Sequence, residues 1–165
     1  MPTRLARPGM LVLCCGFLLA HAAFADDKKL PPVNEEVLKF ARASTGKQVG
    51  NGECWTLADQ ALAAAKGKRP GRNGYGTYVF GRELKADEAI LPGDIVQLMQ
   101  AKFVAKNSQF EMPQHTAVVT QVDGSKIEIL HQNFNNSRQV AEFSFDKTEL
   151  TKGKVTFYRP QPAGR

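Results

Sequence analysis

The stretch Gln48-Val-Gly-Asn-Gly-Glu-Cys-Trp55 decides the fold, because it places a cysteine directly before the most regular helix pattern in the chain. Apolar residues follow at helical spacing, namely Leu57, Ala58, Ala61, Leu62 and Ala65. Gly67 is the residue type that commonly ends a helix. The small alanine side chains allow a close approach to a neighbouring layer. We therefore predict a buried helix that begins at the cysteine.

The rest of the chain predicts one earlier helix and mainly strands afterwards. Asn34 is expected to cap a first helix over residues 35–43. Apolar and β-branched segments predict strands at residues 78–80, 95–99, 115–122, 126–133, 139–143 and 154–158. Helices followed by strands are typical of an α+β domain with a mostly antiparallel sheet. We expect the Cys54 helix to pack on that sheet.

Residues 1–25 have the features of a secretory signal peptide. Arg4 and Arg7 precede an apolar run over residues 10–24, and Ala23-Phe24-Ala25 offers a small-x-small cleavage site. The run is too short to span a membrane. We therefore expect a secreted or periplasmic protein without stable membrane insertion. The predicted organisation is a disordered lead-in at 26–33, one domain at 34–160 and a flexible tail at 161–165.

The composition excludes several classes of protein. Loss of Arg4 and Arg7 lowers the formal net charge from +6 to +4, which fits an ordinary solvated surface. The part after residue 25 holds two histidines, one cysteine and no Cys-x-x-Cys, so we predict no metal and no cofactor. The glycines of residues 71–76 follow no evident strand and lack a phosphate-binding pattern. We expect a monomer that binds no nucleic acid.

Cys54 is the candidate nucleophile, because a helix N-terminus is a setting that lowers the pKa of a thiol. A lone cysteine can equally be a small buried hydrophobe. The only histidines after residue 25, His115 and His131, favour the catalytic interpretation. They lie in two strands that one tight turn would join.

The register of that hairpin decides whether the histidines meet. A three-residue turn Asp123-Gly124-Ser125 would pair Val122 with Lys126. The same register would pair Val119 with Ile129, Ala117 with His131 and His115 with Asn133. Both histidines and Asn133 would then share one face of the sheet. A two-residue Asp123-Gly124 turn would move His131 to the opposite face.

If the three-residue turn forms, each polar residue has a chemical role. Cys54 would attack a carbonyl carbon and His115 would act as its base. His131 or Asn133 would orient the His115 ring, as the third member of a triad does. The Gln48 side chain and the Cys54 backbone N–H would donate to the developing oxyanion. Trp55 is expected in the core or in the wall of a substrate groove.

Three segments resemble the papain-like CHAP amidase/peptidase family and its NlpC-type relatives. They are Gly-Glu-Cys-Trp at 52–55, Leu-Pro-Gly-Asp at 91–94, and His-Thr-Ala-Val-Val at 115–119 followed by Ile-Glu-Ile-Leu-His-Gln-Asn at 127–133. The resemblance covers roughly residues 34–160 and implies a papain-like fold, with Cys54 as nucleophile and His115 as base. It also implies a thiol protease or amidase of cell-wall peptides. CHAP enzymes commonly carry Glu-x-Asn where this chain has His131-Gln-Asn133, whereas NlpC-type enzymes often use a second histidine.

Two alternatives share the same scaffold. A catalytically silent relative would use the groove to bind peptide or glycan. An acyl transferase or deamidase would use the same thiol and release different products. The sequence predicts the cysteine hydrolase first, acting on peptide or amide bonds such as those of peptidoglycan.

Overall fold

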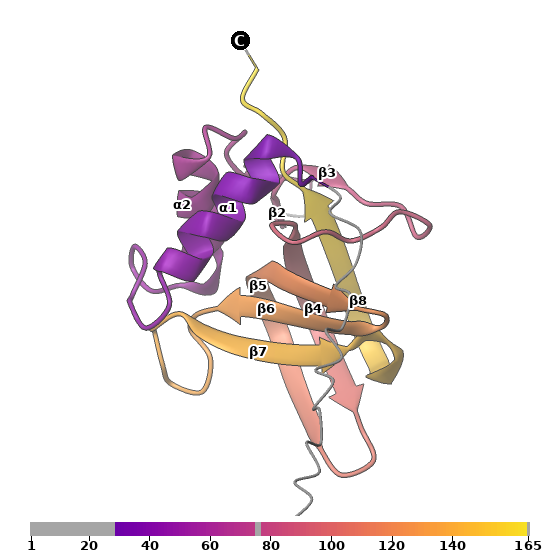
Figure 1. Ribbon diagram of the computed structural model, residues 1–165. Helices are drawn as coiled ribbons and strands as arrows, with labels where there is room; N and C mark the ends of the chain where they lie inside the picture. The colour runs from indigo at the N-terminus through magenta and orange to yellow at the C-terminus, as the bar shows by residue number, and fades with distance from the viewer. Residues whose placement is uncertain (1–28, 75–76, 165) are drawn as a thin grey trace, which may run out of the picture.

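In the described part of the chain, two helices precede all of the strands (Figure 1). Helix α1 spans Pro32–Ala43 and helix α2 spans Cys54–Ala64. The structure, a computed structural model, describes residues 29–74 and 77–164, so the predicted signal peptide lies outside the described residues. Within those ranges no helix has the length and apolar character needed to cross a membrane.

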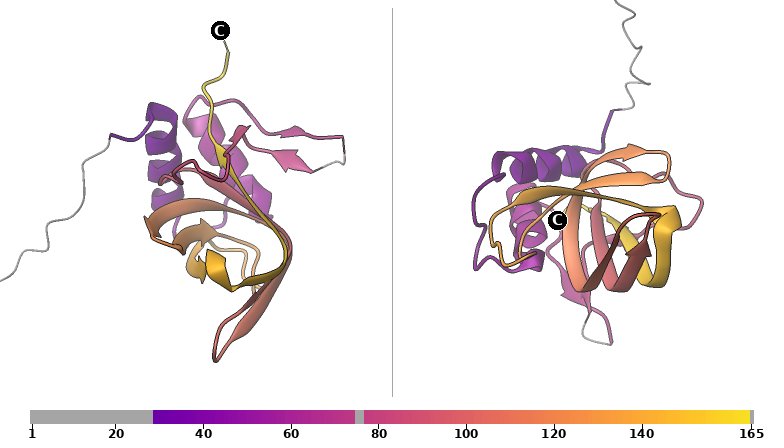
Figure 2. Two further views of the ribbon diagram at one scale, coloured as in Figure 1. Left: turned by 90° about the vertical axis from the view of Figure 1, so that its right-hand side faces the viewer. Right: turned by 90° about the horizontal axis from the view of Figure 1, so that it is seen from below.

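Within the described residues, six strands form one antiparallel sheet in the order β3-β8-β4-β5-β6-β7. These strands are β3 (Arg82–Glu83), β4 (Ile95–Val104), β5 (Gln109–Asp123), β6 (Lys126–His131), β7 (Ala141–Asp146) and β8 (Leu150–Arg159), with the short 3-10 helix η1 (Lys147–Glu149) before β8. A separate hairpin pairs β1 (Gly71–Arg72) with β2 (Tyr78–Val79). The sheet is strongly curled, and both helices cover one of its faces (Figure 2). The predicted α+β class is confirmed.

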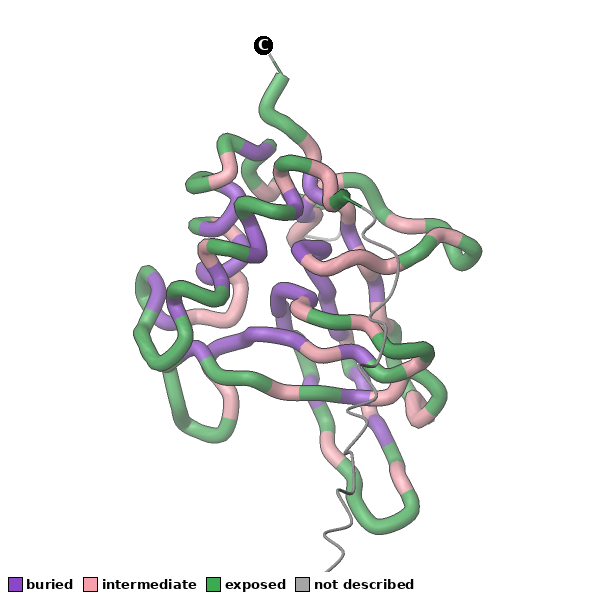
Figure 3. Tube along the Cα trace, viewed as in Figure 1, coloured by how far each residue is buried: buried purple, intermediate pink, exposed green. Residues whose placement is uncertain are grey.

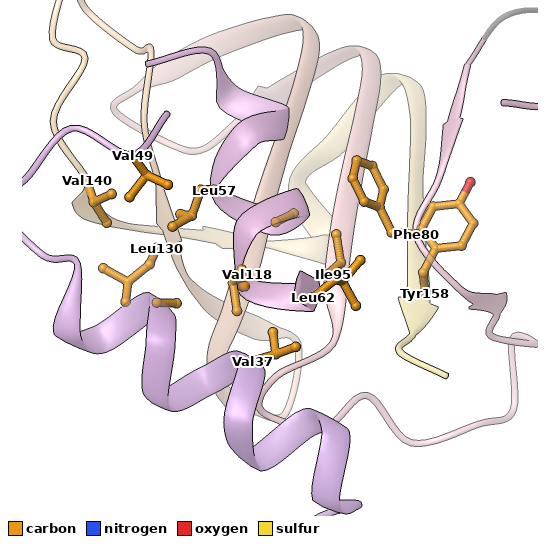
Figure 4. Packing of buried hydrophobic residues seen from close by; sticks show 13 residues of the cluster. Val37, Val49, Leu57, Leu62, Phe80, Ile95, Val118, Leu130, Val140 and Tyr158 are labelled. Carbon is orange, nitrogen blue, oxygen red and sulfur yellow. The ribbon is translucent and has the colours of Figure 1, made fainter. Parts of the chain in front are cut away.

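The sheet carries an apolar core on each face, because successive side chains of a strand point to opposite sides. Ile95 and Val118 face the helices and pack with Leu57 and Leu62 of α2 (Figure 4). Val96, next to Ile95, instead enters the core inside the curl. Buried segments lie where helices meet the sheet, whereas the tip of the β4–β5 hairpin is exposed (Figure 3). The core on the helix side packs α2 against β5.

Helix α1 begins earlier than predicted. It starts at Pro32, a residue type whose fixed φ suits the first helical turn. Asn34 therefore lies inside the helix and is not its cap. The fully buried Asn34 side chain donates to the Pro92 carbonyl at 3.1 Å and to the Asp94 carboxylate at 2.8 Å. A residue predicted to cap the start of the helix thus ties that helix to the turn before β4.

A buried ion pair extends this contact to the last strand. The Arg159 guanidinium donates to both carboxylate oxygens of Asp94, at 2.8 and 3.0 Å. The Leu91 backbone N–H donates to the same carboxylate at 2.8 Å. We call Asn34, Asp94 and Arg159 the α1–β8 joint. It holds the first helix to the sheet.

The last residues differ from the predicted flexible tail. The Lys68 backbone N–H donates to the Gln161 carbonyl at 2.7 Å, and the Ala163 N–H donates to the Lys66 carbonyl at 3.2 Å. These bonds attach residues 161–163 to the loop after α2. The segment is therefore part of the folded domain as far as the chain is described.

The β5–β6 turn differs from both predicted forms. Asp123 pairs with Lys126, so the two turn residues are Gly124 and Ser125, and Gly124 takes the left-handed φ of +58°. The predicted pair of Val122 with Lys126 is therefore wrong. A bulge at Thr120 then shifts the register by one residue. As a result the predicted pair of Val119 with Ile129 does form, and His115 and His131 lie on the same face.

Candidate active site

Cys54 is the first residue of α2, and its thiol lies against β5. Glu53 occupies the N-cap position without a side-chain cap, which leaves backbone N–H groups of the first turn available. The thiol takes part in hydrogen bonds with the backbones of Thr116, Trp55 and Cys54 itself. Thr116 directly follows His115 on β5. The structure thus brings the candidate nucleophile to the strand that carries the candidate base.

The pKa of the Cys54 thiol is raised, contrary to the lowering expected at a helix N-terminus. Burial is the largest cause, because a thiolate loses its hydration when the group is enclosed. The three backbone hydrogen bonds act in the opposite direction, and the nearby Glu53 carboxylate adds to the increase. Near neutral pH the resting nucleophile is therefore a protonated thiol.

The two histidines form a direct pair. His115 Nε2 lies 2.8 Å from His131 Nδ1, and the ring planes are inclined at 77°. His115 is 4% exposed and His131 is 3% exposed. Phe134 contacts both rings, and Phe143 contacts the His131 ring. The pair is therefore enclosed by aromatic side chains.

This enclosure sets the charge of the pair. The pKa of His115 is lowered to about 4, first by burial and then by the neighbouring His131. Burial also lowers the pKa of His131 to about 4. Both rings are therefore neutral near pH 7, and one of them donates the single proton that their hydrogen bond requires.

Asn133 lies elsewhere than predicted. Strand β6 ends at His131, and Asn133 takes a left-handed φ of 62°, so the expected pair with His115 does not form. The Asn133 side chain instead donates to the Glu53 carboxylate at 2.8 Å. Of the two predicted orienting residues, His131 is the one whose ring meets His115.

Gln48 and Trp55 flank the cysteine. The exposed Gln48 side chain donates to the Gly50 carbonyl at 3.3 Å, within its own loop. Trp55 is half-buried and stacks on Tyr78 with ring centroids 4.9 Å apart. The Arg72 guanidinium lies 4.4 Å from the centre of the Tyr78 ring. The start of α2 therefore borders an aromatic and cationic surface.

The residues that hold the loop before the cysteine were not predicted from the sequence. We call residues 49–53 the pre-cysteine loop. The Arg138 guanidinium donates to the Asn51 carbonyl at 2.9 Å and to the Glu53 carboxylate at 3.0 Å. The buried Gln132 side chain bonds to the same loop. The segment after His131 thus contacts the segment before Cys54.

Among the described residues, no group of three or more His, Cys, Asp or Glu could hold a metal ion.

Two helices packed on an antiparallel sheet, with Cys54 at the start of the second helix, define the class as a papain-like cysteine proteinase fold. The chain belongs to the family of the AIM3/BBC1 cysteine proteinase-fold domain, whose model matches residues 32–164. Altered inheritance of mitochondria protein 3 from Debaryomyces hansenii is 34% identical over 151 residues, which cover 79% of this chain and 16% of that protein. SH3 domain-containing protein C23A1.17 from Schizosaccharomyces pombe is 26% identical over 148 residues, which cover 81% of this chain and 9% of that protein. The match therefore spans only a small part of these relatives.

Solved structures agree on the fold. The crystal structure of Ly7917 matches with a TM-score of 0.51 and 22% identity, over 76% of this chain and 62% of that chain. A second structure, of Ly7917 with the hydrolyzing product of MDP, matches with a TM-score of 0.52 and 23% identity, over 77% and 62% of the two chains. At this identity the likeness establishes the fold alone.

Proposed function

We propose that this chain is a cysteine hydrolase that cleaves amide or peptide bonds, with Cys54 as nucleophile and His115 as base. The observation that carries the proposal is the position of the Cys54 thiol against Thr116, directly after His115, whose ring is held by His131. Membership of a cysteine proteinase-fold family supports the same chemistry.

The neutral resting state defines the first step. His115 would take the thiol proton as the sulfur attacks the substrate carbonyl, because a thiol with a raised pKa is a weak nucleophile until it is deprotonated. This role requires a lone pair on the His115 nitrogen that is not bonded to His131. That tautomer is present when His115 Nε2–H donates to His131 Nδ1. His131 thereby orients the base.

In the following steps, the proton that His115 took from the thiol passes to the leaving group. The tetrahedral intermediate collapses as the C–N bond breaks, and the proton on His115 passes to the leaving amine. Water then attacks the Cys54 thioester with His115 again as base, which releases the acid and restores the thiol. The backbone N–H of Cys54 would donate to the oxyanion. Gln48 would join it after leaving the Gly50 carbonyl, a long contact at an exposed position.

We further propose a peptide of the cell wall as substrate, and secretion of the protein. The resemblance to CHAP and NlpC-type enzymes supports this substrate class. The Ly7917 structure with the hydrolyzing product of MDP adds support from a protein of the same fold. The surface of Trp55, Tyr78 and Arg72 would form one wall of the substrate groove.

Incubation of the full chain with purified peptidoglycan and with defined wall peptides tests this proposal. We expect new free amino and carboxyl ends, and none with Cys54→Ala. Release of ammonia without new peptide ends would indicate a deamidase, and transfer to an added amine would indicate an acyl transferase. Absence of turnover on all substrates would contradict the hydrolase.

A second candidate is a catalytically silent peptide-binding or glycan-binding module. The raised pKa of Cys54 and the low pKa of His115 favour it, because neither group is ionised near pH 7. This module would bind wall peptides with equal affinity in the parent chain and in Cys54→Ala, and the parent chain would show no turnover. Calorimetric titration of both forms separates it from the hydrolase.

A further inference from the structure

Gln132 is a buried polar residue directly after His131, and it is only 1% exposed. Its side-chain carbonyl accepts from the Val49 N–H at 3.0 Å. Its amide nitrogen donates to the Val49 carbonyl at 2.9 Å, to the Glu53 carbonyl at 2.8 Å and to the Thr56 hydroxyl at 2.8 Å. One side chain therefore engages both ends of the pre-cysteine loop and the first turn of α2.

The place of Gln132 in the chain gives these bonds their significance. The preceding residue, His131, holds the His115 ring, whereas Gln132 bonds to the residue that precedes Cys54. These partners lie about 80 residues away along the sequence. Residues 131–132 therefore contact both the His115 ring and the loop that leads into Cys54.

Both N–H groups of this amide are engaged, since they are shared among three acceptors, which makes its position well defined. Loss of the side chain would leave the buried Val49 N–H without its partner, which is unfavourable because a buried donor has no water to bond to. The Thr56 hydroxyl would still bond to the Val49 and Glu53 carbonyls at 3.0 and 2.7 Å. The loop would thus stay attached to α2 while it lost its direct link to the end of β6.

We propose that Gln132 is a positioning residue that fixes the Cys54 thiol relative to the His115–His131 pair. The inference rests on the proposed function, because it assumes that His115 activates Cys54. Gln132 itself contacts the backbone of the pre-cysteine loop and one hydroxyl, and it acts on the chemistry only through the residues that it holds.

The test measures how strongly the alkylation rate of Cys54 depends on His115, in the wild-type chain and in the Gln132→Met variant. Alkylation of Cys54 by iodoacetamide is followed by peptide mass spectrometry in the full chain, with and without His115→Ala. In the wild-type background we expect His115→Ala to slow alkylation by about tenfold, since it removes a general base. In the Gln132→Met background, we expect the ratio of the alkylation rates without and with His115→Ala to be close to one.

Asn34→Leu serves as the matched control, because Asn34 is another fully buried amide but belongs to the α1–β8 joint. In this background the tenfold ratio should persist. Thermal unfolding checks that each variant is folded. If Gln132→Met does not fold, Gln132→Glu replaces it, since it retains the acceptor for the Val49 N–H and loses the amide donors.

The outcomes distinguish the proposed hydrolase function from the positioning role of Gln132. A wild-type ratio near one would overturn the proposed function and this inference together. A wild-type ratio near ten that persists in Gln132→Met would overturn only the positioning role. Collapse of the ratio in Asn34→Leu as well would indicate general loosening of the fold and would also overturn it.

Discussion

The molecule contains two buried polar clusters that differ in charge, since one contains an ion pair and the other is neutral. The α1–β8 joint consists of the Asp94–Arg159 ion pair and the Asn34 amide, and Asp94 is fully buried. The His115–His131 pair is equally enclosed but consists of two neutral rings that share one proton. Charge in the first cluster is matched by an opposite charge. In the described part of the chain, neither ring of the second cluster forms an ion pair with a carboxylate.

This difference shows how one small fold separates stability from chemistry. The matched buried ion pair ties the turn before β4 to β8, and the Asn34 amide attaches helix α1 to it. A neutral histidine pair can accept a proton, but only at an energetic cost set by burial. The cluster near Cys54 is therefore the one that can change its protonation state during a reaction. The predictions that follow test this division.

The largest effect is expected for Cys54→Ala. Removal of the nucleophile should reduce turnover by at least about 10³-fold, because the covalent route is lost. The free energy of unfolding should change by less than about 1 kcal/mol, because the thiol is only half-buried. Product formation and urea unfolding measure the two effects. Residual turnover within tenfold of the parent would show that Cys54 is not the nucleophile.

Disruption of the α1–β8 joint should have the next largest effect. Asp94→Ala leaves the Arg159 guanidinium without its buried partner, and we expect a loss of about 3–5 kcal/mol in the free energy of unfolding. Urea denaturation measures this loss. Arg82→Ala is the control, because its ion pair with Glu88 is exposed to solvent and should contribute little to stability.

The comparison requires that Asp94→Ala leave the chemistry intact. In the folded variant, the pH dependence of Cys54 alkylation should match that of the parent. A changed profile would mean that the joint and the candidate active site are coupled, and the two clusters would then not be independent.

The histidine pair should make stability depend on pH. Both pKa values fall from the ordinary 6.5 to about 4 on folding, so the unfolded chain binds more protons between these values. The contribution of the two histidines to the free energy of unfolding is therefore fully present above about pH 6.5, and it is lost as the pH falls toward 4. Each ring contributes on the order of 3 kcal/mol to this change.

Thermal unfolding across this pH range provides the measurement. The double variant His115→Phe with His131→Leu should show a much weaker decline in the same window, because neither residue titrates. Glu88, whose pKa is lowered to about 2 by Arg82, loses its contribution mainly below the histidine window. An unchanged decline in the double variant would assign the pH dependence to other groups.

Much of this arrangement could be predicted from sequence periodicity. The alternation of apolar residues in β5 and β6 indicated which side chains share a face, including Val119 and Ile129. The turn was predicted incorrectly, yet the face of His131 was right, since the bulge at Thr120 offset the shorter turn. A bulge adds one residue without a characteristic composition, so the sequence gives no sign of its position.

The contacts around Cys54 were harder to predict, because they depend on tertiary structure. A helix N-terminus lowers a thiol pKa through local dipoles, but the neighbouring strand buries Cys54 and reverses the sign. Gln132 directly follows His131, the last residue of β6. Its partners in the pre-cysteine loop could not be identified, since no periodic pattern relates such distant segments. Arg138 lies in a loop and gave no signal.

The smallest effect is expected from the charge beside the nucleophile. The Glu53 carboxylate raises the pKa of the Cys54 thiol, so Glu53→Gln should lower this pKa and speed alkylation near neutral pH by about two- to threefold. The glutamine can still accept one of the bonds now made by Asn133 and Arg138. Arg138→Ala should have the opposite effect, because it leaves the Glu53 charge unbalanced. If both variants slow alkylation equally, the loop geometry and not the charge controls the thiol.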